Sequence, residues 1–221
     1  MAVTITHGSY KFTISTPSSM TVNEGNINSA YTSVYKPTVK RDKTGTAITR
    51  YIFFQLESSN VGWEIAVYKA VFTKTGTSAT VTSYRTLRMG DIARAKLEDG
   101  VNTLYVGVAN SLSGDEDAKS VAMTVNVNLY PTITLTSSKS QDSPAPATFG
   151  YIKGFCTGSV TATIKKTWTY TGGSVTVPIS SSSLTGNGRS ASGTSGTSLT
   201  LSLGTLNATS ITVSATAKNS R

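Results

Sequence analysis

Charged residues are scarce in this sequence of 221 residues, since only 14% of them are Asp, Glu, Lys or Arg. Ordinary globular chains carry roughly 25% charged residues. Ser, Thr, Gly and Asn take the place of the missing charges, and these residue types suit pleated strands and tight turns. Apolar residues nevertheless recur at regular spacing almost throughout the chain, which indicates a folded protein rather than a disordered one.

Cysteine and histidine are rarer still, because Cys156 and His7 are the single residues of their types. A lone cysteine excludes an intrachain disulfide and the paired-cysteine spacing of a zinc site. The sequence points to no serine and no orienting carboxylate beside the lone histidine, so it offers no nucleophilic dyad. We therefore expect His7 to lie, without a catalytic role, in a frayed first segment, and Cys156 to be a buried, inert thiol.

Long apolar runs are also absent, so the sequence predicts no membrane span. Residues 1–7 contain neither a basic region nor an apolar stretch, and we expect no secretory signal there. A Ser/Thr-rich chain without an export signal is typical of a virion component, which is made inside a cell and released by lysis. A mature secreted fragment is the alternative.

Carboxylates are nearly missing from the second part of the chain. Residues 1–130 carry 13 basic and 10 acidic side chains, a net charge of +3, whereas residues 131–221 carry seven basic and one acidic, a net charge of +6. This excess favours an anionic partner, such as an acidic protein surface or glycan, or serves solubility. Only residues 40–43 and 165–166 form local basic clusters, and no nucleic-acid-binding motif accompanies them, so we do not expect nucleic acid as the partner.

The few carboxylates form no pattern that carries chemistry. The acidic run at residues 115–117 lacks the alternate-residue spacing of an EF-hand, and we expect a solvated turn in a loop rather than a calcium site. Glu57 and Glu64 are the candidate pair for glycoside hydrolysis, but each adjoins an apolar strand and is expected to face solvent. We predict no catalytic residue, cofactor or metal ligand, and we expect that the protein is not an enzyme.

Alternation of apolar and polar residues is the dominant pattern, and it predicts strands. In the first part of the chain these are residues 3–5, 10–14, 52–56, 63–71, 80–84, 104–108 and 121–129. A short helix competes only in residues 86–98. Short strands at this spacing predict a β-sandwich.

Pro131 marks the best domain boundary, because proline ends strand pairing and a new alternation begins at Thr132. The sequence thus predicts an all-β chain with two domains, residues 1–130 and a smaller one at 131–221. The strands expected in the second domain are residues 132–135, 149–156, 160–164, 168–170, 175–177, 199–203 and 211–217. Residues 180–198, almost wholly Ser, Gly, Thr and Asn, are predicted to form a long, mobile loop.

The two predicted domains end alike. Residues 97–111 and 206–220 each contain a turn, an alternating strand and then Asn-Ser. On these segments the chain resembles the bacterial and phage immunoglobulin-like repeats, whose penultimate strand often follows a Leu-x-x-Gly turn. The spacing from Cys156 to Trp168 is also similar to that between strands B and C of immunoglobulin domains, although no second cysteine follows. The resemblance implies two tandem immunoglobulin-like β-sandwich domains, as found in phage virion structural proteins.

The second domain has one strand fewer than the first if the two are equivalent. The first continues after its Asn-Ser with strand 121–129, whereas the sequence ends one residue after Ser220. The strand at 211–217 would then have an unpaired edge. Three explanations stay open: the chain is cleaved from a longer precursor after Arg221, a partner adds a strand by β-augmentation, or the second domain is simply smaller.

Candidate contact residues follow from the charge and from this edge. Trp168 and Tyr170 lie two apart beside Lys166 and could form a glycan platform, but Ile164 on the same face favours a buried position. The candidate partner contacts are three cations and three residues of the last strand: Lys165, Lys166, Arg189, Ile211, Val213 and Ala215.

These features together predict a non-enzymatic structural protein of a bacteriophage virion, in a capsid-decorating, head-fibre or tail-associated position. We expect it to act through contacts with other virion proteins in a symmetric assembly, with adhesion to the host surface or an acidic glycan as a further role. The alternative is a secreted or cell-surface adhesin or carbohydrate-binding module.

Overall fold

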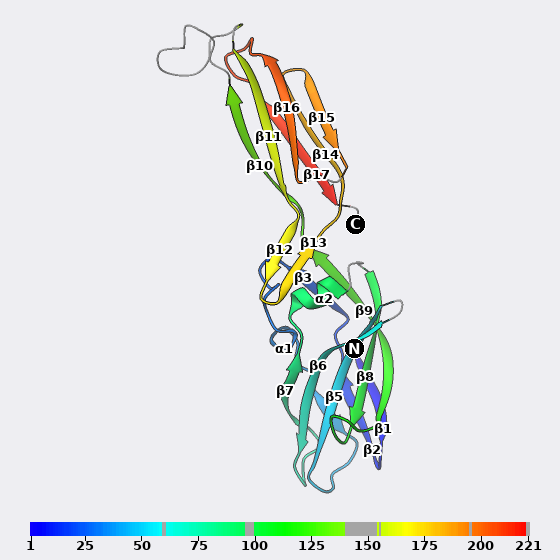
Figure 1. Cartoon of the computed structure of the whole chain (residues 1–221). Helices are drawn as coiled ribbons and strands as arrows, with labels where there is room; N and C mark the ends of the chain where they lie inside the picture. Colours follow the sequence, from blue (N-terminus) through cyan, green and yellow to red (C-terminus); the bar gives the residue numbers. More distant parts are fainter. Residues whose placement is uncertain (59–60, 96–99, 140–153, 155, 195, 220–221) are drawn as a thin grey trace. The chain divides into compact units, whose positions relative to one another are not determined.

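The computed structural model describes residues 1–58, 61–95, 100–139, 154, 156–194 and 196–219. Within them, strands joined by turns predominate and only two short helices occur, so the chain is all-β, as the sequence predicts (Figure 1). Contacts divide the chain into two compact units. The first comprises Met1–Asn128 and Thr169–Val175, and the second comprises Leu129–Trp168 and Thr176–Arg221.

In the described part of Met1–Asn128, the strands form two sheets. A three-stranded sheet has the order β1-β2-β4, and a six-stranded sheet has the order β3-β9-β8-β5-β6-β7. The strands are β1 (Ala2–His7), β2 (Tyr10–Ser15), β3 (Ser19–Asn23), β4 (Val39–Arg41), β5 (Ile48–Ser58), β6 (Val61–Phe72), β7 (Thr80–Thr86), β8 (Gly100–Ala109) and β9 (Glu116–Asn128). All the strands predicted for this part of the chain are confirmed, with longer bounds for most.

The core of the first unit lies between these two sheets. Alternate residues of β2, namely Tyr10, Phe12 and Ile14, are buried, as the period of a strand requires. The ring of Phe12 lies 5.6 Å from that of Phe72 in β6, which ties the small sheet to the large one.

Two short helices complete the first unit. Helix α2 (Met89–Ala95) falls within the segment where the sequence indicates a competing helix, and that indication is confirmed. Helix α1 (Tyr31–Val34) is a single turn that the sequence pattern does not reveal, because four residues are too short for a 3.6-residue period to show.

The second unit contains two three-stranded sheets, with the orders β10-β11-β16 and β15-β14-β17. The strands are β10 (Thr132–Lys139), β11 (Thr157–Lys165), β14 (Ile179–Gly186), β15 (Arg189–Gly193), β16 (Ser198–Thr205) and β17 (Val213–Asn219). Side chains from both sheets form one buried cluster: Cys156, Val160, Ala162, Leu184, Leu201, Leu203 and Leu206. The buried position predicted for Cys156 is confirmed.

A hairpin of β12 (Thr167–Tyr170) and β13 (Gly173–Thr176) interrupts the second unit. Its residues 169–175 group with the first unit. There the Tyr170 hydroxyl donates a hydrogen bond to a carboxylate oxygen of Asp91 in α2, at 2.8 Å. Gly90 makes room for the Tyr170 ring, since a Cβ atom at that glycine would lie 2.6 Å from it.

The mobile loop predicted at residues 180–198 is wrong. Most of this segment forms strands β14 and β15, which pair in register from Ser182↔Gly193 to Gly186↔Arg189. The turn between them is Asn187-Gly188, with positive φ angles of 49° and 67°. Asn-Gly is the preferred pair for a two-residue hairpin turn of this hand, so the turn chemistry outweighs the loop-like composition.

Three smaller predictions are also corrected. His7 is not in a frayed segment, because it is buried in β1, and its Nδ1 lies 2.7 Å from a carboxylate oxygen of Asp117. Asp117 itself, like Glu116, belongs to β9 rather than to a loop. The last strand begins at Val213 rather than Ile211. The strand predicted at 149–156 lies mostly outside the described residues.

Candidate partner-binding site

Strand β17 is an edge strand of its sheet. Among the described residues it pairs with β14 alone, from Val213↔Gly186 to Asn219↔Ile179. The residues of β17 that point toward the core are Val213, Ala215 and Ala217, and all three are only half-buried. In the central strands the equivalent positions, such as Leu184 and Val160, are fully buried. The core-facing side of β17 is therefore incompletely covered.

Strand β10 is an edge of the opposite sheet, with β11 as its one paired neighbour in the described part of the chain. Its core-facing residues are Ile133, Leu135 and Ser137, which lie opposite Ile164, Ala162 and Val160 of β11. Leu135 is 42% exposed, although it is a large apolar residue on the inner side of a strand. In both edge strands, therefore, apolar residues on the core-facing side remain partly exposed to solvent.

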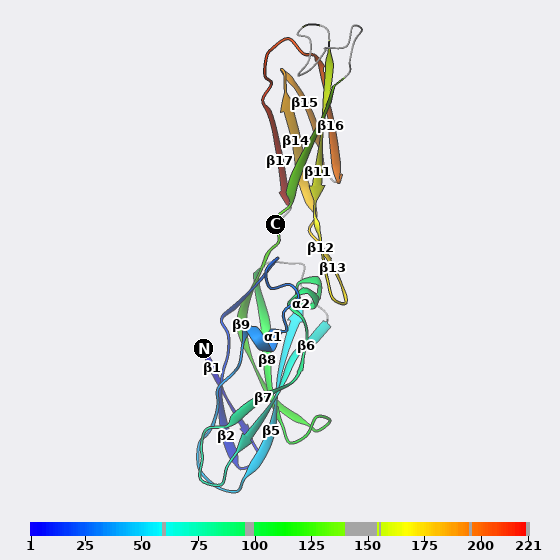
Figure 2. The same ribbon diagram turned by 90° about the vertical axis from the view of Figure 1, so that its left-hand side faces the viewer.

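These two edges lie side by side along one side of the second unit, where β10 and β17 contact each other over part of their length. Figure 2 shows β10 and β17 separating toward the end of the unit at which β10 finishes. We call this gap the open seam and define it by five half-buried or exposed apolar residues: Ile133 and Leu135 of β10, Ile211, and Val213 and Ala215 of β17.

A hollow of about 340 Å³ opens at the wider end of the seam. Its lining combines apolar residues of the core with small polar ones: Ser137, Ser138, Gly158, Ser159, Val160, Leu203, Leu206, Ile211 and Val213. A Cβ atom at Gly158 would lie 3.0 Å from the Leu206 side chain, so the glycine allows that side chain to lie over β11. Two of the lining serines, Ser138 and Ser159, hydrogen-bond to each other at 2.7 Å, and the apolar part of the lining can receive apolar side chains.

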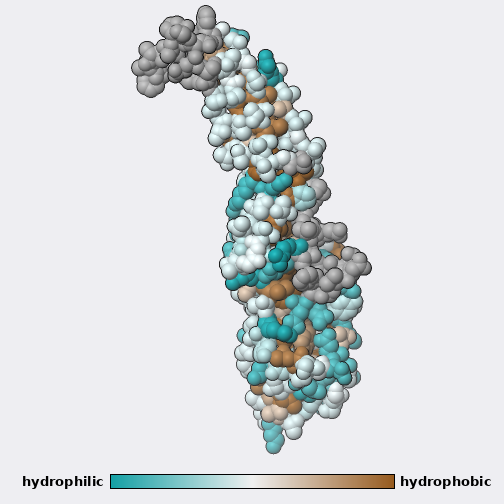
Figure 3. Space-filling model, in the orientation of Figure 1, coloured by the Kyte–Doolittle hydropathy of each residue, from teal (hydrophilic) through white to brown (hydrophobic). Residues whose placement is uncertain are grey.

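The electrostatic setting of the seam is cationic. Asp142 is the one acidic residue in 131–221, and it lies outside the described residues. Lys218 projects from the exposed face of β17, at the seam, whereas the guanidinium of Arg189 lies over Gly204 of β16, at the opposite edges of the two sheets. Figure 3 shows hydrophobic atoms reaching the surface of this unit between weakly polar ones. The site is thus an apolar gap in a positively charged unit.

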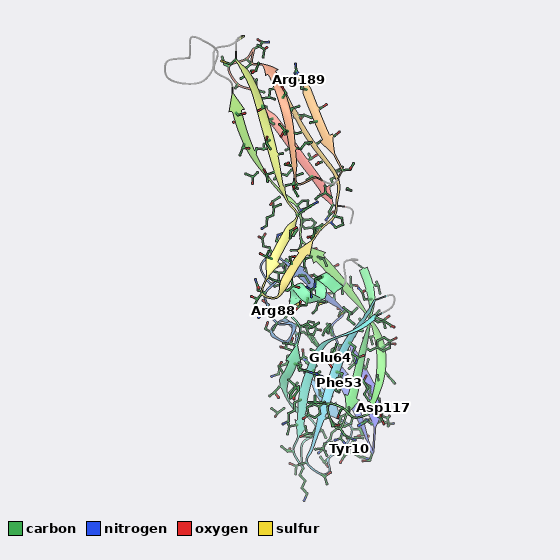
Figure 4. The ribbon with its side chains drawn as sticks, in the orientation of Figure 1. Tyr10, Phe53, Glu64, Arg88, Asp117 and Arg189 are labelled. Carbon is green, nitrogen blue, oxygen red and sulfur yellow. The ribbon has the colours of Figure 1, made fainter. Side chains whose placement is uncertain are left out.

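The six predicted contact residues do not form one patch. Lys165 is the last residue of β11, whereas Arg189 lies beside Gly204, which pairs with Gly158 near the start of that strand. Lys165 and Lys166 are therefore at one end of the unit and Arg189, labelled in Figure 4, is at the other. Ile211, Val213 and Ala215 do lie together, along the seam.

The β10 side of the seam is the part that sequence reasoning missed. The alternation at 132–135 shows that Ile133 and Leu135 share a face, but it does not show which strand lies opposite. Only the sheet order reveals that β10 and β17 are both edges.

The buried position that the sequence favours for Trp168 and Tyr170 is confirmed, and the alternative, a glycan platform, is contradicted. Trp168 is 3% exposed and Tyr170 is 7% exposed. The ammonium of Lys165 lies 5.6 Å from the centre of the Trp168 ring, a cation–π contact at the end of β11.

The ionisable side chains that could take part in a reaction belong to the first unit and not to the seam. In the first unit, the buried His7 is held by Asp117, and its Nε2 atom has no hydrogen-bond partner among the described residues. Glu64 forms an ion pair of 3.0 Å with Arg85. Partial desolvation, and secondarily the charge of Glu64, raises the pKa of Glu116. Within the described residues no three potential metal ligands gather into a cluster.

No protein-family model matches the chain, and no curated protein matches it either. In the described part of the chain, no helix has the length and apolar character needed to cross a membrane.

Proposed function

We propose that this protein is a non-enzymatic structural component of a bacteriophage virion, and that it joins its neighbours through the open seam of the second unit. The observation that carries the proposal is the pair of adjacent edges, β10 and β17, with incompletely covered apolar side chains between them. Unpaired edges attract additional strands, and natural proteins rarely leave them open without a use. Strand addition is an established mode of protein–protein recognition.

The fold supports a scaffold role of this kind. The second unit has two three-stranded sheets around one apolar core, and the first has a small and a large sheet. We assign both units to the immunoglobulin-like class of sandwiches, on the sheet arrangement together with the sequence resemblance of residues 97–111 and 206–220. Such units present their exteriors and edges to partners, and repetition by symmetry multiplies each weak contact over a particle.

Quantitative mass spectrometry of purified particles tests the proposal. The chain is expected in a fixed copy number that is a multiple of the symmetry of the head or tail, and to stay bound through density-gradient purification. Recovery of the chain only from the cell envelope or the culture medium, and not from particles, would overturn the virion assignment.

A second candidate, a surface adhesin that binds carbohydrate, is favoured by one observation in the first unit. Tyr84 in β7 is 50% exposed, and its ring meets the ring of Tyr51 edge-to-face at a centroid distance of 5.7 Å. Arg85, the residue after Tyr84, forms an ion pair with Glu64, which is labelled in Figure 4. Exposed aromatic rings beside polar groups suit sugar stacking.

A glycan array probed with the full chain separates the two candidates. Adhesin function requires binding that Tyr84→Ala abolishes and that Thr82→Ala, on the same exposed strand, leaves intact. Absence of binding to any glycan on the array removes this candidate and leaves the virion proposal untouched.

A further inference from the structure

We infer that the open seam accepts one extended strand of an acidic partner protein, with large apolar side chains at alternate positions facing the hollow and carboxylates on the other face. This inference rests on the proposed function, because it names the chemistry of the partner at the same seam. Three features of the second unit specify the strand: its backbone edge, its hollow and its charge.

The backbone edge sets the length and the conformation of the partner segment. β17 has seven residues, and its whole length is paired with β14 on one side only within the described residues. An edge strand presents a row of N–H and C=O groups, which an extended segment satisfies and a helix does not. A segment of about seven residues matches that row.

The hollow sets the side chains on the inner face of the segment. Ile211 and Val213 line it beside Leu203 and Leu206 of the core, and Leu135 lies on the core-facing side of β10, outside the lining of the hollow but along the same seam. Successive side chains of a strand point to opposite faces, so alternate residues of the added strand enter this apolar space. Large apolar side chains remove from water both their own surface and the half-exposed residues of the seam.

Charge sets the outer face of the segment and argues against a second copy of this chain. The face of β17 away from the core carries Ser214, Thr216 and Lys218. A carboxylate directly across from Lys218 forms a favourable cross-strand pair. Two copies of the second unit would instead bring together segments that each have a net charge of +6.

Synthetic heptapeptides test the inference on the full chain. Binding of fluorescein-labelled peptides that alternate Val with Glu, Val with Lys, or Ser with Glu is measured by fluorescence anisotropy. The Val–Glu peptide is expected to bind at least about tenfold more tightly than either of the others, because only it meets both the apolar and the charge requirement. Equal affinity for all three, or preference for the Val–Lys peptide, overturns the inference.

Two matched variants locate the binding. Leu135→Asp and Thr134→Asp add the same charge to adjacent positions on opposite faces of β10. Only Leu135→Asp is expected to abolish binding of the Val–Glu peptide, because its carboxylate enters the apolar gap. A thermal melt of each variant verifies folding, and Leu135→Ser replaces the first variant if it unfolds. Equal loss in the Leu135 and Thr134 variants would place the peptide elsewhere and overturn the inference.

Charge reversal at Lys218 fixes the register. Lys218→Glu is expected to weaken binding of the Val–Glu peptide by about two- to fivefold and to strengthen binding of the Val–Lys peptide by a similar factor, the range that one cross-strand charge pair gives.

Sedimentation equilibrium on the full chain tests whether a second copy of this chain is the partner. A stable dimer that Leu135→Asp dissociates overturns the inference of a different partner protein. If the peptides discriminate as expected but the chain is absent from particles, the inference about the seam stands and the virion assignment is wrong. If the chain is present in particles but the peptides do not discriminate, the virion assignment stands and the inference about the seam is wrong.

Discussion

Arg41 is a buried cation whose side-chain hydrogen bonds, among the described residues, go to backbone carbonyls and not to a carboxylate. Its side chain is 3% exposed and donates hydrogen bonds to the carbonyl oxygens of Thr46, Thr73, Lys74 and Gly76. The guanidinium lies 5.2 Å from the Tyr10 ring and 5.3 Å from the Phe72 ring. Arg41 therefore connects the loop before β5, which contains Thr46, to the loop after β6, which contains residues 73–76.

The sequence shows residue 41 only as part of a basic run at 40–43, which suggests a surface patch. The residues next to an arginine in the sequence do not show whether its side chain is buried or exposed. What separates them is the set of carbonyls around the side chain, and those come from residues 46 and 73–76, which folding alone brings together.

Replacement of Arg41 by methionine is expected to lower the free energy of unfolding by about 3 kcal/mol, because several buried carbonyls lose a charged donor. Urea denaturation measures the loss. Arg85→Met is the control: its side chain is 52% exposed and pairs with Glu64 at the surface, so its loss is expected to be below about 1 kcal/mol. Equal effects of the two substitutions would contradict the role given to Arg41.

Glu116 is expected to make the stability of the first unit decrease as the pH rises. Partial desolvation of its carboxylate, which lies against Gly107, and secondarily repulsion from Glu64 raise the pKa of Glu116 above its ordinary value of 4.5, although the residue as a whole is exposed. The folded state therefore binds this proton more tightly than the unfolded state does. Stability from this residue is present at low pH and is lost as the pH rises through the raised pKa.

Glu116→Gln, which cannot ionise, is thus expected to have a higher Tm than the parent chain at about pH 7, and the difference is expected to vanish at about pH 4. Differential scanning calorimetry across this range measures both. Asp115→Asn, at an exposed position in the preceding turn, serves as the control. A Tm gain that stays constant with pH would point to a cause other than ionisation.

At the scale of single elements, the β14–β15 hairpin depends on its turn. Asn187 and Gly188 both adopt positive φ, and the side-chain amide of Asn187 donates to the carbonyl oxygens of Leu203 and Thr205. The turn thereby joins β14 and β15 to the end of β16. The Ser/Thr-rich composition concealed this hairpin from composition-based reasoning, although the Asn-Gly pair was visible in the sequence.

Gly188→Ala is expected to destabilise the chain by about 1 kcal/mol, because a Cβ atom is strained at a φ of 67°. Gly188→Asn is expected to cost less, since asparagine tolerates the left-handed region better than alanine does. Chemical denaturation of both variants tests the turn geometry. A greater loss for asparagine than for alanine would be inconsistent with it.

Strand positions themselves were largely predictable from the sequence, for a physical reason. In β2 and β11 every second residue is apolar and buried, so the pattern in the sequence is the pattern of burial. The prediction was less accurate where this link breaks. Ile211 continues the apolar alternation of β17 but precedes the strand, and it lines the hollow instead.

At the scale of the whole molecule, the chain concentrates its excess positive charge in 131–221, the segment that supplies the open seam. The charge asymmetry and the edge character of the last strand could be predicted from the sequence. The seam as a site could not, because it needs two edges, β10 and β17, that are distant in sequence and whose pairing partners are fixed by sheet order. Leu135 belongs to the site only through that tertiary arrangement.

Hydrogen–deuterium exchange of β17, compared between the isolated chain and purified particles, tests the central claim most directly. In the isolated chain the amides of Val213–Asn219 that point away from β14 are expected to exchange quickly, while the amides of β14, a central strand, are slow in both samples. In particles the fast amides of β17 are expected to slow by at least about tenfold, because an added strand accepts their hydrogen bonds. Identical exchange of β17 in the two samples would contradict strand addition at the seam.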